Sequence, residues 1–400
     1  MAFKKKHLLY IITFFWVSAL VACEREGANA QAVSGKDTLV KVPERVVQKN
    51  DSITTITITF DGAANGTIAT IPLLKYGKSK CITFDFDDGA LVAPEKFAAT
   101  TYTDGCGNAI PYTAGIAVNG RHGWNNAEYG VFTYMTYAKM REMINKGWDI
   151  MNHGYYHNFG EANDNYTFGP DAMRNLTALD SLILEKVRYK MNVLVVPTDY
   201  KGYHIAAGKY GYLGGSSQNA FDNLPLWMLG QRPHLVSQMK KDNYYVNERE
   251  FAWKGWVPRG QHGEWIWEFV DKISTASGVR TQEIGTHDMN EKEADILRQW
   301  LQEIKDRNKD DLMMTSLREF LEYQYLRLHI EPAIEISGNQ MAINLNYPAL
   351  ANKNISWHDL SFTISGNAAI EKVECSDPDF KFTYNQSARL VNIKKRVLQW

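Results

Sequence analysis

The sequence predicts an α/β fold in which a largely parallel sheet or barrel is followed by a small β-sandwich. From about residue 79 to 329, short apolar runs alternate with stretches of helical periodicity, the pattern of repeated strand–helix units. After about residue 330 the helical pattern ends, and short alternating runs separated by turn residues take its place. Such runs are typical of a sandwich.

The composition is that of a globular chain with ordinary charge. The 400 residues include 44% hydrophobic and 22% charged residues, enough for a sizeable core in two or three domains. A formal net charge of -1 gives no electrostatic reason to expect a nucleic-acid partner. After Cys23, only Cys81, Cys106 and Cys375 remain, and so odd and sparse a count argues against a disulfide scaffold. Cys81 and Cys106 could pair in an oxidising compartment.

Residues 1–23 have the pattern of a bacterial lipoprotein signal. Three lysines precede an apolar run over residues 8–22, shorter than the ~20 residues of a spanning helix. The run ends in Leu20-Val-Ala-Cys23, which resembles a lipobox. We expect export, a lipid on Cys23 at a bacterial membrane facing the periplasm or cell surface, and a tether over residues 24–36. The alternative is an ordinary signal peptide with an incidental cysteine.

Residues 37–78 form an N-terminal β segment in this interpretation. Polar and apolar residues alternate cleanly over 54–60, and a second β-type run covers 67–74. The glycines and Asn65 between them favour a turn. We expect a hairpin that precedes the main domain.

The main domain, residues 79–329, divides into alternating elements. Pro170 suits the first turn of a helix, Gly147 suits a helix end, and Leu297, Leu301 and Ile304 lie on one helical stripe. We expect strands at 81–86, 148–151, 191–196, 282–285 and 312–315, and helices at 131–146, 170–190, 291–308 and 316–328. In the C-terminal β-rich domain, residues 330–400, we expect strands at 333–336, 342–345, 360–364 and 380–384.

Two short motifs contain residues suited to metal chemistry. Asp87 and Asp88 end the first strand of the main domain, although Asp-Asp-Gly is by itself usually a solvated turn. His153 and His157 follow the next strand with a spacing that places both on one helical face. By themselves they could be a surface pair. Together, one carboxylate and two imidazoles are a ligand set for zinc or a similar ion, with positions left open for water and substrate.

These motifs resemble those of the polysaccharide deacetylase family, also called the NodB homology domain. Residues 86–89 are similar to its first motif, His153 and His157 to its second, residues 283–288 to its late motif, and residues 313–323 to its ending. The resemblance covers residues 79–329. It implies a distorted, incomplete β/α barrel and attack of metal-activated water on an acetyl carbonyl.

The resemblance also implies a role for each residue. Asp87 would be the general base and His287 the general acid, while Asp88, His153 and His157 would bind a divalent metal. Zinc is the first expectation, with Co²⁺, Fe²⁺ and Ni²⁺ as alternatives. The substrate would be an acetylated polysaccharide or oligosaccharide that loses N- or O-acetyl groups.

The chain departs from the family in its middle region. Residues 195–200 contain no arginine beside Pro197, and the family's Asp-Trp motif has only loose counterparts, such as Asp222 with Trp227, or Trp253 and Trp256. Two other functions therefore stay open. One is hydrolysis of another non-peptide C–N amide on the same scaffold, and the other is glycan binding by a catalytically inactive, lipid-anchored relative. The glycan and the oligomeric state are not fixed by the sequence.

Overall fold

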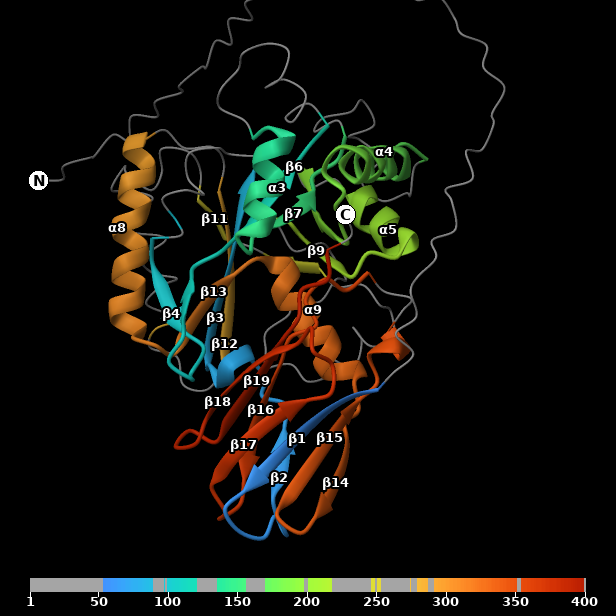
Figure 1. Ribbon diagram of the computed structural model, residues 1–400. Coiled ribbons are helices and arrows are strands. Elements are labelled where there is room, and N and C mark those ends of the chain that lie inside the picture. The colour runs from blue at the N-terminus through green and yellow to red at the C-terminus, as the bar shows by residue number, and fades with distance from the viewer. Residues whose placement is uncertain are drawn as a thin grey trace, which may run out of the picture. The chain divides into compact units, whose positions relative to one another are not determined.

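A parallel sheet built around strand β3 (Lys80–Asp87) lies at the centre of the computed structural model (Figure 1). The structure describes residues 53–88, 97, 99–120, 135–155, 170–197, 201–217, 246–248, 250–252, 274, 279–286, 291–350 and 354–398. Over these residues, nine strands form the sheet, in the order β10-β9-β8-β7-β6-β3-β12-β11, with β13 also paired to β3. Strands β13 and β6 pair with the first and last parts of β3 respectively, and β12 pairs along seven of its residues.

All of these pairings are parallel. Within the described residues, the terminal strands β10 and β11 do not pair with each other, so the sheet is open. The predicted α/β class and incomplete barrel are therefore confirmed. Besides β3, the strands are β6 (Gly115–Val118), β7 (Asp149–Asn152), β8 (Val193–Val195), β9 (Gly214–Ser217), β10 (Val246–Glu248), β11 (Glu250–Ala252), β12 (Arg280–Thr286) and β13 (Leu312–Thr315).

Strand β3 is buried along its whole length, as expected for a parallel strand covered on both faces. Aromatic and acidic side chains alternate along the last part of β3. Phe84 packs against Phe97 at 5.0 Å between ring centroids, and Phe86 packs against Trp148 at 6.1 Å. Because successive side chains point to opposite faces, Asp85 and Asp87 lie on the face away from this aromatic cluster.

The bounds of the helices in the main region agree closely with the predictions after residue 290 and less closely before it. The helices are α3 (Tyr137–Asn145), α4 (Pro170–Val187), α5 (Lys201–Tyr210), α8 (Glu291–Asn308) and α9 (Leu317–His329). Helix α8 and strand β13 have the predicted bounds. Helix α3 begins later than predicted because the Thr136 side chain accepts a hydrogen bond from Lys139 N and caps the helix there. Local pattern does not predict α5, β6, β9, β10 or β11, nor the small hairpin sheet of β4 (Thr101–Thr103) and β5 (Ala109–Pro111).

The remaining strands form two four-stranded antiparallel sheets, which we call the β unit. One sheet has the order β14-β15-β1-β17 and the other β18-β19-β16-β2, in agreement with the sandwich-like architecture expected after residue 330. The elements are β1 (Thr54–Phe60), β2 (Ile68–Thr70), β14 (Ala333–Ser337), β15 (Gln340–Leu345), β16 (Leu360–Ser365), β17 (Ile370–Cys375), β18 (Lys381–Asn385) and β19 (Leu390–Lys394), with short 3-10 turns at Lys75–Gly77 and Tyr347–Leu350.

The predicted N-terminal hairpin is wrong. Strand β1 pairs with β15 and β17, whereas β2 pairs with β16 in the other sheet. In Figure 1 the blue β1 accordingly lies among the orange and red strands from the other end of the chain. Strand β1 has the predicted bounds, and β2 covers only residues 68–70 of the run predicted over 67–74. A partner so distant in sequence, such as Met341 opposite Ile58, leaves no local signal.

The structure bears on the predicted cysteine pairing and on membrane-spanning helices. Cys81, Cys106 and Cys375 are free thiols, so Cys81 and Cys106 are not paired. Among the described residues, no helix is both long and apolar enough to cross a membrane. The proposed signal and tether, residues 1–36, lie outside the described residues.

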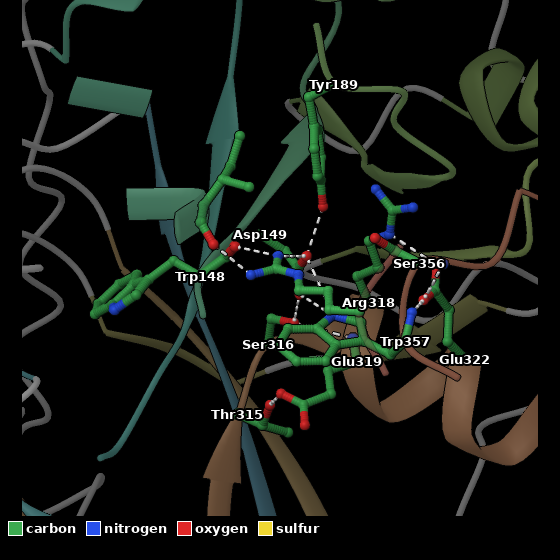
Figure 2. A network of polar contacts seen from close by, with 12 residues as sticks. Trp148, Asp149, Tyr189, Thr315, Ser316, Arg318, Glu319, Glu322, Ser356 and Trp357 are labelled. Atoms are coloured by element: carbon green, nitrogen blue, oxygen red, sulfur yellow. Dashed lines mark hydrogen bonds and ion pairs between the residues drawn. The ribbon is translucent and has the colours of Figure 1, made fainter. Parts of the chain in front are cut away.

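A buried ionic network joins the parallel sheet to the β unit at the start of β7 (Figure 2). The Asp149 carboxylate is fully buried. It accepts hydrogen bonds from Arg396 at 2.9 Å, Trp357 Nε1 at 3.0 Å, and the hydroxyls of Tyr189 and Ser316. Burial alone would raise the pKa of Asp149, but Arg396, Arg318 and the two hydroxyl donors hold it below its usual value. The carboxylate therefore stays ionised inside the protein.

We predict that Asp149→Asn lowers the free energy of unfolding by about 3 kcal/mol at pH 7, because the buried arginines lose their counter-charge. Since the folded pKa is depressed, this contribution is present above the unfolded value of ~3.9 and is lost as the pH falls through the folded pKa. Urea unfolding of both proteins at several pH values measures it. The gap between them should narrow on acidification, and a constant gap would contradict the assignment.

Candidate functional site

The carboxyl ends of the central strands meet at one edge of the sheet because the strands are parallel. Strands β3, β6, β7 and β8 are consecutive neighbours in the sheet. They end at Asp87, Val118, Asn152 and Val195, respectively. The residues that follow these ends form the candidate site.

Asp87 and Asp88 lie at the end of β3. Asp87 is 2% exposed and is paired with Ala117 of β6. Asp88 is partly exposed and has a φ of +61°, a left-handed conformation that aspartate tolerates better than most residues. The chain therefore leaves the strand at Asp88, so the two adjacent carboxylates are not bound by strict strand alternation.

Asn119 links Asp88 to the neighbouring strand. Its Nδ2 donates a hydrogen bond to Asp88 Oδ1 at 3.2 Å. The carbonyl of the preceding residue, Val118, accepts a hydrogen bond from His153 N at 2.9 Å. Asp88 and His153 are thus attached to successive residues at the end of β6. Strands β3 and β7 flank β6, so their backbones are about 10 Å apart.

His153 follows β7 directly and is 1% exposed. Its Nδ1 lies 2.8 Å from Val195 O at the end of β8. Because a carbonyl oxygen can only accept a hydrogen bond, Nδ1 carries the proton and Nε2 carries the lone pair. A ring whose other nitrogen is held by a backbone carbonyl is the usual arrangement of a histidine metal ligand.

The helical basis of the His153–His157 prediction is wrong over the described residues, because His153, Gly154 and Tyr155 are not helical. Gly154 has a φ of +74°, and its N–H donates to Asn152 Oδ1 at 2.8 Å. This turn fixes the backbone beside His153. A Cβ on Gly154 would lie 2.5 Å from the Tyr203 hydroxyl, so the turn leaves no room for a side chain.

The face of the sheet that carries Asp87 also holds two carboxylates that the sequence analysis does not single out. Asp85 is fully buried and Glu283 is 1% exposed. Glu283 is in register with Thr83 and Asp85 with Gly285, so both acids share the face of Asp87. A Cβ on Gly115 would lie 2.6 Å from Asp85 Oδ1, which accounts for the glycine opposite this carboxylate.

The predicted ligand and catalytic sets are only partly described. Of the expected residues, Asp87, Asp88 and His153 are placed at the site, whereas His157 and His287 lie outside the described residues. Within the described part of the chain, no group of three or more His, Cys, Asp or Glu side chains is arranged to hold a metal ion. The loose Asp-Trp counterparts, Asp222, Trp227, Trp253 and Trp256, also lie outside it.

Sequence reasoning missed Asn119 and the Val195 carbonyl. The signal for Asn119 was the short apolar run at residues 115–118 followed by Asn-Gly, a pattern of a buried strand and a turn. No sequence signal marks the Val195 carbonyl, since a backbone acceptor is present at every residue.

No protein-family model matches the chain, and no curated protein matches it. Among solved structures, peptidoglycan deacetylase PdaC from Bacillus subtilis is similar at a TM-score of 0.35 and 15% identity, covering 62% of this chain and 93% of that one. PdaA from Bacillus subtilis, a family 4 carbohydrate esterase, gives 0.36 and 12%, covering 63% and 84%. A family 4 acetyl xylan esterase from Clostridium thermocellum, in complex with a cobalt ion, gives 0.31 and 16%, covering 60% and 89%.

We predict that Gly154→Ala lowers the free energy of unfolding by about 3 kcal/mol, from left-handed backbone strain together with the clash against Tyr203. Gly211→Ala is the matched control, because Gly211 also has a positive φ, of +95°, but open space around its Cα. That variant should lose only the strain, about 1 kcal/mol. Urea unfolding compares the two, and equal losses would show that Tyr203 does not confine the turn.

Proposed function

We propose that the chain is a metal-dependent hydrolase that removes N- or O-acetyl groups from a polysaccharide. One observation carries the proposal. Asp87, Asp88 and His153 lie at the same edge of a parallel sheet, with Asp88 and His153 both attached to the end of β6. The His153 ring is held in the tautomer that presents the lone pair of Nε2.

The residues at this edge fit a divalent ion. In our proposal Asp88, His153 and His157 hold it, with zinc as the first candidate and Co²⁺, Fe²⁺ or Ni²⁺ as alternatives, since one carboxylate and two imidazoles suit all of them. When bound, such an ion supplies Lewis-acid chemistry: it lowers the pKa of water and polarises an acetyl carbonyl.

Proton transfer is assigned to two residues that are not ligands. Asp87 is adjacent to Asp88 and ends a buried strand, so its carboxylate can be held rigidly beside the attacking water. It accepts the proton of that water as the water adds to the acetyl carbon. His287 follows Thr286, the last residue of β12, and we assign it the proton donated to the departing sugar nitrogen or oxygen. Acetate and the deacetylated glycan are the products.

The substrate class rests on the resemblance of residues 86–89, and of His153 with His157, to the polysaccharide deacetylase motifs. The site chemistry by itself suits hydrolysis of an acetyl amide or ester, and does not select one glycan.

We also propose that the protein is exported and anchored by a lipid on Cys23, with residues 24–36 as a tether. The site would then face glycans of the periplasm or the cell surface. Support comes from the short apolar run and the cysteine that ends it.

We predict that Asp87→Asn lowers the rate of acetate release about a hundredfold to ten-thousandfold, the usual effect of losing a general base, while the protein keeps its metal. His153→Ala should lose the metal and the activity together. The measurements are acetate release from a panel of acetylated glycans, with and without a chelator, and metal content of the purified protein.

Asp306→Asn, an exposed position on α8, is the matched control and should retain both metal and activity. Release of acetate that resists both the chelator and Asp87→Asn would refute the mechanism. Absence of release from every glycan, with measurable glycan binding, would favour a catalytically inactive binding protein. Hydrolysis of other amides alone would favour the amide-hydrolase alternative.

A further inference from the structure

Arg396, near the end of the chain, contacts the turn between α3 and β7. Its Nη1 donates to Ile144 O in the last turn of α3. Its Nη2 donates to Trp148 O at 2.7 Å and to Asp149 Oδ1 at 2.9 Å. One guanidinium therefore holds the end of the helix and the start of the strand that leads to His153.

Arg396 is itself held by the β unit. Its guanidinium carbon lies 4.0 Å from the ring centroid of Trp357, and the two residues form an isolated β-bridge. Trp357 also donates from Nε1 to Asp149 Oδ2 at 3.0 Å (Figure 2), and from its backbone N to Glu322 Oε2 at 2.7 Å. Helix α9, the β unit and the start of β7 are thus tied together at a single point.

Strand β7 depends on such a tie because its sheet pairing is uneven. It pairs with β6 at four positions, from Asp149 to Asn152, but with β8 only at Asn152 opposite Leu194. The strand has four residues, so Asp149 and His153 are about 13 Å apart along an extended chain. Residues 149–151 therefore have strand partners only on the β6 side, and the contacts of Arg396 and Trp357 with Asp149 hold the start of the strand in addition.

We infer that Arg396 is a positioning residue, which fixes the start of β7 and through it the His153 side chain. The β unit then contributes to the geometry of the ligand site through Arg396 and Trp357. The inference rests on the proposed function only where it treats His153 as a metal ligand.

The chemistry of the side chain supports an arginine in this role. Three acceptors, two carbonyls and a carboxylate, surround one guanidinium, and a planar fork with five N–H groups can satisfy all of them. A lysine ammonium at the same place cannot span them while stacking on Trp357. Removal of the guanidinium also takes a positive charge away from the buried Asp149 carboxylate.

The test uses the full mature protein with Arg396→Met, which keeps an unbranched stem against Trp357. Arg389→Met is the matched control: Arg389 donates to Ile364 O at 2.8 Å and to Ala368 O at 2.9 Å, so its contacts lie wholly within the β unit. Two properties are measured. One is the affinity of the metal-free protein for Zn²⁺ by calorimetry, and the other is amide hydrogen exchange of residues 149–153.

We expect Arg396→Met to weaken Zn²⁺ binding about tenfold, the scale seen when a ligand's supporting contacts are lost, and to speed exchange in β7. Arg389→Met should change neither, even if it lowers overall stability. Arg396→Lys should fall between wild type and Arg396→Met in both measurements. Should Arg396→Met fail to fold, Arg396→Lys and Trp357→Phe, which lacks the indole N–H, carry the same comparison.

A folded Arg396→Met protein with wild-type Zn²⁺ affinity and wild-type exchange in β7 would overturn the inference. If the wild-type protein binds no divalent ion, the proposed function fails by itself. The exchange measurement then still decides whether Arg396 holds β7.

Discussion

The parallel pairing of β3 with its neighbours is the constraint on which the rest of the structure depends. Because β12, β6 and β13 all run in the direction of β3, every strand end that carries polar chemistry meets at one edge. The same strand buries two carboxylates, Asp85 and Asp87, at a cost in desolvation. Packing of Phe84 and Phe86 on the opposite face offsets part of that cost.

Strands from both ends of the described chain form the β unit. This unit contacts helix α9 and the start of β7, and so it holds the parallel sheet at the end opposite the carboxyl ends of its strands. Strand β1 lies between β15 and β17, and β2 pairs with β16. Helix α9 contacts this unit through Tyr323 and Gln324, which donate to the carbonyls of Pro72 and Leu73. The Lys75–Glu319 and Arg318–Glu322 ion pairs are almost fully buried. Such pairs contribute little net stability, but breaking one is costly, so they fix geometry.

Much of the fold and part of the site could be predicted from local pattern. The charged helix over Glu291–Asn308 and the strand over Leu312–Thr315 have the expected bounds, because periodicity and flanking residues are local properties. Strand β6 was missed because two of its four residues are glycine and alanine, which are depleted in strands, and Asn119 was missed with it. The helical interpretation of His153 failed because Asn152 Oδ1 binds Gly154 N and turns the chain there, a choice made by side-chain contacts.

The sequence by itself determined which segments alternate as strand and helix, and it placed Asp87 and Asp88 at the end of one strand and His153 after another, since both follow from residue type and spacing along the chain. Only the tertiary structure decided the partners: β1 with β15, Asn119 with Asp88, His153 with the Val195 carbonyl, and Arg396 with Asp149. The physical reason is that hydrogen bonds and ion pairs depend on distance in space. Residues such as Asp149 and Arg396, 247 positions apart in the chain, are brought within bonding distance only by the fold.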